Sequence, residues 1–373
     1  MKVLGIVAEY NPFHNGHLYH IKQAKKISDF IIVIMSGNYV QRGEPAIINK
    51  YLRTRAALQN GIDLVLELPI YFATSSAEIF AYGAIKSLHA TGIIDAISFG
   101  CECDDITILT KISDMKNKFD IKKEMADGKS YPLAFQNFIA KKLPGYEKFI
   151  LPNNILALEY LTALKKISWH PQIYPVKRKI TMHNENELNV NFSSAYAIRN
   201  AIKNGKNVAK FLPYQFDFQN YTDINNASNI LHYLIATKKL TNNILGMNEG
   251  IENRIKKAAQ NNFLITDIIQ NANSKRYTNS KISRIILHAI LDMQKNDFAT
   301  EPKYLRVLGF RKQSQILLTM ISKKSLLPLI TNLKNSNLIP QKEIASSDLY
   351  FNFMQAQKFF LKNFEYTQPL VIE

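Results

Sequence analysis

The sequence is poor in cysteine and has no long hydrophobic run. Cys101 and Cys103 are its only cysteines. A one-residue spacer would strain a disulfide between them, and two thiols cannot complete a zinc site, so we expect two reduced side chains. No apolar run approaches the ~20 residues that span a bilayer, and no signal-like segment begins the chain. These absences exclude a disulfide scaffold and predict a cytoplasmic protein with no membrane partner.

Acidic residues are also in short supply. The chain holds 47 Lys and Arg against 30 Asp and Glu, which gives a formal charge of +17. Such an excess attracts polyanions and favours a nucleic-acid partner. The alternative is a lysine-rich composition whose charges are spread over the whole surface, because composition does not show where charges converge. With 373 residues, of which 46% are hydrophobic, the chain can bury a substantial core, and its length suggests two domains.

The N-terminal stretch predicts a strand, a turn and a helix. Residues 3–8 form an apolar run of strand length, residues 9–17 contain a Pro/Asn/Gly turn, and residues 18–21 continue at helical spacing. A helix that starts at the carboxyl end of a buried strand points its free amide groups into the crevice there. The stretch therefore predicts a site for nucleotide phosphates.

The turn carries His14, Gly16 and His17 in a His-x-Gly-His pattern. Gly16 lets the backbone approach a phosphate, and histidines three residues apart project to the same side of a helix start. Such a pair can stabilise charge on the α-phosphate oxygens while pyrophosphate leaves. Their protonation stays open, because the helix terminus disfavours imidazolium and phosphates favour it. Two alternatives remain: a metal cluster of His14, His17 and His20, or a structural turn with satisfied histidines.

The following residues alternate strands with helices. We predict strands at 30–35, 64–69 and 96–100, with helices at 50–58 and 75–89. This alternation predicts an α/β fold with a doubly wound, Rossmann-like parallel sheet, whose ligand crevice lies at the carboxyl ends of the strands. His14, Gly37 and Gly100 would all lie at that edge.

The middle of the chain reads as helices at 105–118, 131–142 and 154–166, followed by a strand at 172–178. Asn153 is placed either to cap the third of these helices or to contact a nucleotide. Ser193 and Ser194 begin a further helix, and Arg199 lies along it. Two hydroxyls, free amides and an arginine form a second phosphate cradle, unless the serines only cap the helix.

Beyond Gly205 the strand alternation stops. Residues 225–295 read as amphipathic helices, including one over 281–291, and basic residues recur beside aromatics at 275–277, 303–306 and 310–312. Such clusters suit phosphate contacts with base stacking, and solvated helix faces are the alternative. We therefore predict a nucleotide-binding catalytic domain over 1–204 and a mainly α-helical, basic domain over 205–373.

Five stretches together resemble one family. They read Glu-Tyr-Asn-Pro-Phe-His-Asn-Gly-His at 9–17, Met-Ser-Gly-Asn at 35–38, Gln-Arg-Gly-Glu-Pro-Ala at 41–46, Pro-Asn-Asn-Ile-Leu at 152–156 and Lys-Arg-Tyr-Thr at 275–278. They are similar to the bacterial tRNA(Met) cytidine acetate ligases of the His-x-Gly-His nucleotidyltransferase superfamily, over essentially the whole chain. That family activates acetate with ATP to acetyl-adenylate and acetylates the N(4) amine of the wobble cytidine of elongator tRNA(Met). The resemblance implies a nucleotidyltransferase-type sheet and the same ligase activity.

Carried over by position, the resemblance implies catalytic roles for His14 and His17 and an ATP site. With the second cradle added, the expected ATP-binding residues are Val7, Ala8, Glu9, Tyr10, Asn11, Pro12, Phe13, His14, Asn15, Gly16, His17, Leu18, Tyr19, His20, Gly100, Asn153, Arg178, Ser194 and Arg199. The basic clusters predict tRNA contacts by Lys275, Arg276, Arg311 and Lys312. The family tends to have Ser-Glu-Asn at 101–103, where this chain has Cys-Glu-Cys, and a Thr is common at the position of Tyr196.

The expected substrates are ATP, acetate and elongator tRNA(Met). Mg²⁺ is a plausible helper for the pyrophosphate, although no carboxylate cluster marks its site, and the sequence does not specify an oligomeric state. Two other functions stay open. One is an adenylyltransferase that acts on a small phosphorylated metabolite and ignores RNA, and the other is a non-catalytic RNA-binding module that keeps ATP as a structural ligand. The basic helical region argues against the first, and the paired histidines argue against the second.

Overall fold

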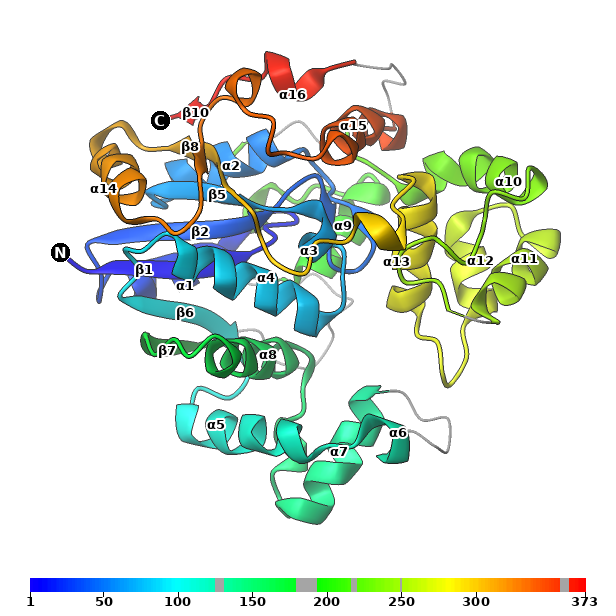
Figure 1. Cartoon of the computed structure of the whole chain (residues 1–373), viewed down its shortest axis with the longest axis horizontal. Helices are drawn as coiled ribbons and strands as arrows, with labels where there is room; N and C mark the ends of the chain where they lie inside the picture. The colour runs from blue at the N-terminus through cyan, green and yellow to red at the C-terminus, as the bar shows by residue number, and fades with distance from the viewer. Residues whose placement is uncertain (125–130, 179–192, 216–219, 249, 356–361) are drawn as a thin grey trace.

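The computed structural model describes residues 1–124, 131–178, 193–215, 220–248, 250–355 and 362–373 (Figure 1). Its first half alternates strands and helices. The elements are β1 Val3–Ala8, α1 Asn15–Ala24, β2 Phe30–Ser36, β3 Tyr39–Val40, β4 Glu44–Pro45, α2 Lys50–Gln59, β5 Leu64–Leu68, α3 Ile70–Ala73, α4 Ala77–Ala90, β6 Ala96–Cys101, α5 Ile106–Met115, α6 Ile121–Glu124, α7 Tyr131–Lys142, α8 Pro152–Lys166 and β7 Gln172–Lys177.

The second half is mainly helical but returns to the sheet. Its elements are α9 Ala195–Lys203, α10 Ser228–Ala236, α11 Ile251–Asn261, α12 Ile265–Ala272, α13 Asn279–Ile290, β8 Leu305–Phe310, α14 Ile316–Lys324, β9 Leu329–Ile330, α15 Gln341–Leu349, α16 Phe364–Thr367 and β10 Val371–Ile372. None of the described helices is both long and apolar enough to cross a membrane.

The central sheet has eight strands, in the order β10-β8-β5-β2-β1-β6-β7, with β9 also paired to β8. The run β5-β2-β1-β6-β7 is parallel throughout. The chain passes from β1 outward to β2 and β5, then crosses back to β6 on the other side of β1. The order therefore reverses between β1 and β6, which is where open parallel sheets bind ligands. This confirms the predicted doubly wound sheet.

Alternating residues of the strands pack on opposite faces of the sheet. On one face, Ile31 and Val33 of β2 share a core with Ile21 of α1 and Ala57 of α2. On the other face, strand side chains meet Leu88 of α4 and residues of α8. Because β2 is buried on both sides, it reads as a continuous apolar run, which is why this strand is predictable.

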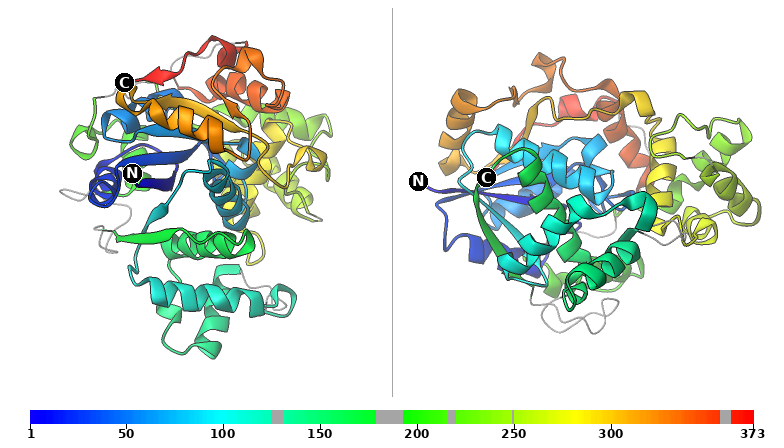
Figure 2. Two further views of the ribbon diagram at one scale, coloured as in Figure 1. Left: turned by 60° about the vertical axis from the view of Figure 1, so that its left-hand side comes forward. Right: turned by 60° about the horizontal axis from the view of Figure 1, so that its bottom comes forward.

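The helices α10–α13 lie beyond the carboxyl ends of the parallel strands, on the side away from the N-terminus (Figures 1 and 2). We call α10–α13 the helical lobe. Its core includes Ile255, Ile268 and Ile286, together with Tyr39 and Tyr71 from the first part of the chain. The lobe is therefore packed directly against the hairpin β3-β4 and helix α3.

Strand β8 was not predicted. It pairs antiparallel with β5, and its outer edge pairs with both β9 and β10. Residues 303–306 and 310–312 are predicted from their sequence as basic clusters of the helical region. Residues 305–310 instead extend the central sheet, while the division of the chain at residue 204 stays a prediction.

A buried ion network joins β5, β8, α2 and α16. Lys50 Nζ lies 2.6 Å from Glu67 Oε1 and 2.7 Å from Glu365 Oε1, and Arg306 pairs with both carboxylates. Tyr51 donates its hydroxyl to Glu365 at 2.8 Å. The four charged side chains are at most 5% exposed. Glu67 and Arg306 are cross-strand partners in the antiparallel register, so the network is built into the pairing of β5 with β8.

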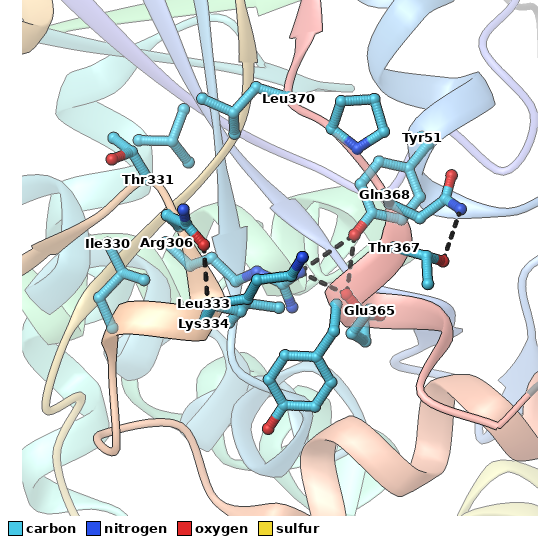
Figure 3. A pocket seen from close by; sticks show the side chains of 14 residues that line it. Tyr51, Arg306, Ile330, Thr331, Leu333, Lys334, Glu365, Thr367, Gln368 and Leu370 are labelled. Carbon is cyan, nitrogen blue, oxygen red and sulfur yellow. Dashed lines mark hydrogen bonds and ion pairs between the residues drawn. The ribbon is translucent and has the colours of Figure 1, made fainter.

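A cavity of about 500 Å³ lies next to this network, with Arg306 and Glu365 in its lining (Figure 3). It sits where the outer edge of β8 is shared, since β9 pairs with Leu305 and Arg306, and β10 pairs with Gly309 and Phe310. Arg306 and Glu365 of the lining are paired with each other. In the sheet order β5 and β2 separate β8 from β1, so the cavity is distinct from the crevice between β1 and β6.

Candidate active site

The loop between β1 and α1 is fixed by hydrogen bonds made by its two histidines. His14 is the N-cap of α1, and its Nδ1 accepts the amide proton of Gly16 at 3.0 Å. His17 Nδ1 accepts the amide proton of His14 at 3.2 Å. The two imidazoles stack, with ring centroids 3.7 Å apart and planes 22° apart. The two side chains thus form a capping box at the start of α1. His14 takes the position usually held by Ser or Thr, and His17 the position usually held by Glu or Gln.

These bonds determine the tautomers. A backbone N–H can only donate, so each Nδ1 is an acceptor and each ring proton sits on Nε2. Burial lowers the pKa of His14 to about 3, with further contributions from Arg178 and Arg199. Burial and the His14 ring lower the pKa of His17 well below its usual value. Both histidines are therefore neutral Nε2–H donors near pH 7 in the protein without nucleotide.

Gly16 has a further role that the sequence analysis did not predict. A Cβ at this residue would lie 2.8 Å from His14 Cε1 and 3.0 Å from His14 Nδ1. Such contacts are closer than van der Waals packing allows, so the missing side chain makes room for the capping imidazole. Gly16 is required by the histidine cap, independently of any ligand.

Tyr10, Phe13 and His20 make contacts within the protein, and ATP binding by the predicted residues of this stretch stays a prediction. Tyr10 and Phe13 are 3% and 0% exposed and their rings pack on His17. His20 Nε2 lies 2.8 Å from Ser98 Oγ, and Ser98 donates to the carbonyl of Tyr174. Since that serine proton is used, Ser98 accepts from His20. Burial, followed by the charge of Arg178, lowers the pKa of His20 to about 4.

Gly100 and Arg178 come together on the neighbouring strands β6 and β7. Gly100 pairs with Val176, and a Cβ at Gly100 would lie 3.7 Å from Arg178 Cγ. The guanidinium of Arg178 donates to Asn153 Oδ1 at 2.6 Å. The same guanidinium contributes to the lowered pKa of His14, His17 and His20. The structure therefore brings these predicted residues to one edge of the sheet.

Asn153 was predicted either to cap α8 or to contact a nucleotide. The structure shows that it does not cap α8. The N-cap is Leu151, whose side chain makes no cap hydrogen bond, and Pro152 lies in the first turn. The first-turn amides of Asn153 and Asn154 donate to the Glu102 carboxylate. The Asn153 amide instead donates to Glu102 Oε1 at 2.6 Å. Glu102 therefore orients Asn153, which in turn accepts from Arg178. The backbone geometry of Pro152 displaces the cap by two residues, because proline favours the first helical position.

The second predicted cradle is arranged differently from the expectation. Ser194 is the N-cap of α9 and accepts from the Ala197 amide at 3.0 Å. Arg199 donates to the carbonyl of Asn11 at 2.8 Å and pairs with Glu44 at 3.2 Å. Arg199 thus holds the loop between β1 and α1 through the Asn11 carbonyl. Its charge also lowers the pKa of His14. Phosphate binding by Ser194 and Arg199 stays a prediction.

Arg53 and Glu9 are site residues whose roles sequence reasoning missed. Arg53 is completely buried, and its guanidinium donates to the carbonyls of Glu9 at 2.6 Å, of Ser36 at 3.1 Å and of Gly37. It therefore ties the ends of β1 and β2 together. Burial raises the pKa of Glu9, whose Oε1 accepts the Gln41 amide at 2.7 Å. In the sequence, Arg53 shares one face of α2 with Ala56 and Ala57. A basic residue on an apolar helix face is the pattern that indicates a buried guanidinium.

The predicted RNA contacts are not brought together. Lys275 and Arg276 are exposed in the connection between α12 and α13 of the helical lobe. Arg311 and Lys312 follow β8, whose antiparallel register places Arg311 beside Asp63 at the amino end of β5. This is the edge of the sheet opposite the histidine loop. A single RNA contact surface that includes all these residues stays a prediction, and the structure shows them at opposite ends.

A metal ion held by protein ligands alone does not fit this site. Among the described residues no group of three or more His, Cys, Asp or Glu side chains converges as metal ligands. The nearby carboxylates are engaged, because Glu9 accepts from Gln41 and Glu44 pairs with Arg199. Mg²⁺ at this site would have to arrive with the phosphates of ATP, which is its usual way of binding to nucleotide enzymes.

Comparisons with known proteins agree on one family. The model of the HIGH Nucleotidyl Transferase family matches residues 1–365. A tRNA(Met) cytidine acetate ligase of Thermosipho africanus is 38% identical over the full length of both chains, and one of a Thermoanaerobacter species is 40% identical over 94% of this chain and 95% of its own.

Solved structures lead to the same family. A Thermotoga maritima TmcAL structure bound with alpha-thio ATP aligns over 100% of this chain and 99% of its own, with a TM-score of 0.86 and 29% identity. The apo form of that protein has a TM-score of 0.88 and 30% identity over the same shares of the chains. With the paired histidines at the end of β1, these matches establish that the chain belongs to the HIGH nucleotidyl transferase family, among the tRNA(Met) cytidine acetate ligases.

Proposed function

We propose that this protein is an ATP-dependent ligase that converts acetate to acetyl-adenylate and transfers the acetyl group to the wobble cytidine of elongator tRNA(Met). The product is N(4)-acetylcytidine. The names of the curated relatives support this reaction over adenylyl transfer to a small metabolite. Because the partner is a tRNA, the proposal places the protein in the cytoplasm.

The observation that carries the proposal is the stacked pair His14 and His17, neutral and protonated on Nε2, beside Arg178 at the β1/β6 crevice. In the first step, an acetate oxygen forms a bond to the α-phosphorus of ATP and the bond to pyrophosphate breaks. Negative charge builds on the α-phosphate oxygens in the transition state. Two Nε2–H donors, already oriented by the helix cap, stabilise that charge without reorganisation.

In the second step, the N(4) amine of cytidine attacks the acetyl carbonyl, loses a proton, and AMP leaves. A base inside an RNA loop or stack cannot reach the crevice, so the target nucleotide must be turned out of its stack. Arg178 and the positive amino end of α1 bind phosphates of the nucleotide. The helical lobe holds the RNA through phosphate contacts, so that affinity falls as salt rises.

The test is an incubation of the purified protein with ATP, labelled acetate and bulk bacterial tRNA, followed by nucleoside analysis of the digested RNA. We expect ATP-dependent label in N(4)-acetylcytidine. Acetate-dependent pyrophosphate release without labelled RNA would preserve the activation step and contradict the acceptor. If neither is seen, the proposed reaction is wrong and adenylyl transfer to a metabolite becomes the leading hypothesis.

A further inference from the structure

A group of cations lies in the first turns of α13 and in the connection that precedes this helix. Arg276 and Lys281 lie over the same aromatic ring, with Arg276 Cζ 5.5 Å and Lys281 Nζ 5.0 Å from the centroid of Tyr277. Arg284 follows Lys281 by one helical turn. We call Arg276, Lys281 and Arg284 the α13 cation cluster.

The α13 cation cluster has no counter-charge among the residues that the structure describes, since none of their ion pairs includes a member of it. Burial, followed by the charges of Arg276 and Arg284, lowers the pKa of Lys281. Burial lowers the pKa of Arg284 to about 10. Cations that are partly buried and repel one another cost free energy, and a bound anion would offset that cost.

The cluster is fixed relative to the catalytic loop. Arg284 donates to the carbonyl of Gln41 at 3.2 Å, and Ser283 donates to the carbonyl of Gly43 at 2.8 Å. The Gln41 amide in turn donates to Glu9, in the loop that follows β1. Two hydrogen-bonded steps therefore connect Arg284 of the helical lobe with the loop that carries His14.

We propose that the α13 cation cluster binds one backbone phosphate of the acceptor RNA, next to the nucleotide that enters the crevice. This inference rests on the proposed function and assigns one subsite of it. A phosphodiester presents several oxygens to neighbouring Lys and Arg donors, and the formal charge of +17 favours a polyanion over an isolated carboxylate of a protein partner. With the phosphate held on α13, the hairpin β3-β4 sets its position relative to the catalytic histidines.

The test uses the variants Lys281→Gln and Arg276→Gln, their double variant, and the control Lys257→Gln. Lys257 is an exposed lysine on α11 of the same helical lobe. Binding of unmodified tRNA(Met) is measured between about 50 and 200 mM salt. Loss of one phosphate contact lowers the log–log salt slope by about 0.7–0.9, and we expect each single variant to bind about tenfold more weakly at low salt. The control is expected to keep the wild-type slope.

The double variant decides whether both side chains hold one phosphate. A shared phosphate predicts that the double variant loses clearly less than the sum of the two single losses. Additive losses, or single variants that match Lys257→Gln, would overturn the inference. Arg276 is exposed, so Arg276→Gln remains informative if Lys281→Gln folds poorly.

Pyrophosphate exchange into ATP, which needs acetate but no RNA, is measured on each variant to verify the nucleotide site. Wild-type protein that makes no N(4)-acetylcytidine contradicts the proposed function, whereas the salt slopes still test the phosphate site. Wild-type acetylation with unaltered slopes in both single variants contradicts only the α13 subsite. The two failures are therefore distinguishable.

Discussion

At the scale of single residues, the site depends on two imidazoles that serve the backbone and the reaction at once. Their Nδ1 atoms hold the first turn of α1, which leaves Nε2–H on each ring as the donor that the proposed reaction uses. A side chain that can cap a helix but lacks the second nitrogen should therefore separate the two roles.

We expect His14→Asn to fold normally and to lose acetate activation. Asparagine is a strong N-cap, so α1 keeps a side-chain acceptor for the Gly16 amide. The oriented Nε2–H is lost, and removal of one such donor costs about 10²–10³ in kcat. Acetate-dependent pyrophosphate exchange measures the loss, and tRNA affinity serves as the control. Exchange within tenfold of wild type would contradict the role given to His14.

His20 should make stability depend on pH. Burial lowers its pKa from 6.5 to about 4, so between these values the unfolded chain binds a proton there and the folded chain does not. The stabilising contribution is thus complete above pH 6.5 and is lost as the pH falls. In His20→Gln, the amide can still donate to Ser98 but does not titrate.

The free energy of unfolding of the wild type should therefore fall relative to that of His20→Gln, by about 1.4 kcal/mol per pH unit between about pH 6 and pH 4.5. Denaturant unfolding of both proteins without ATP measures this difference. The contributions of the other titrating groups cancel because the two proteins share them. Parallel pH profiles would show that His20 has no lowered pKa in the folded protein.

At the scale of elements, the hairpin β3-β4 connects the helical lobe to the loop between β1 and α1. Gly43 has φ of +83°, and a Cβ there would lie 2.3 Å from the backbone nitrogen of Arg284. The close approach of the hairpin to α13 requires glycine on both grounds. Gly205 offers a matched control, because its φ is +67° and nothing lies within 4 Å of the position of a Cβ.

Gly205→Ala should lower the free energy of unfolding by about 1–2 kcal/mol, which is the cost of the left-handed backbone alone. Gly43→Ala should cost about 3 kcal/mol or more, because the added methyl group must also displace α13. Denaturant unfolding compares the two variants. Equal losses would show that the hairpin does not depend on close contact with the helical lobe.

Most elements before residue 204 could be predicted, because strands β1, β2, β5 and β6 are mostly buried and read as apolar runs, and because the helices follow turn residues. Strand β8 could not, since Arg306 interrupts its apolar pattern and reads as a surface charge until Glu67 and Glu365 are seen beside it. The hydrogen bonds by which His14 and His17 cap α1 could not be predicted from the sequence either. Spacing predicted that His14 and His17 lie together, but only the hydrogen bonds to Nδ1 show their tautomers.

At the scale of the whole molecule, the ion network links segments from both ends of the described chain. Lys50 and Arg306 carry two positive charges, and Glu67 and Glu365 balance them. Although burial opposes ionisation, Lys50 and Arg306 lower the pKa of Glu365. Removal of one partner would leave a buried charge uncompensated, which is the costly way to break such a network.

Glu365→Gln should lower the free energy of unfolding by about 3–5 kcal/mol. A second change, Lys50→Met, removes one positive charge and restores the balance, so the double variant should be more stable than the sum of the two single changes predicts. Thermal and denaturant unfolding of the four proteins form the cycle. Additive losses would show that these charges act independently.

The same ion network can be completed only after nearly the whole chain has been synthesised. Glu365 is translated about 300 residues after Glu67, which at about 5–20 residues per second is a delay of roughly 15–60 s. Until Arg306 and Glu365 leave the ribosome, Lys50 and Glu67 lack their second partners and β5 presents an open strand edge. On the nascent chain, strands β1, β2, β5 and β6 can pair early. The edge of β5 stays unpaired until β8 is synthesised, unless a chaperone covers it.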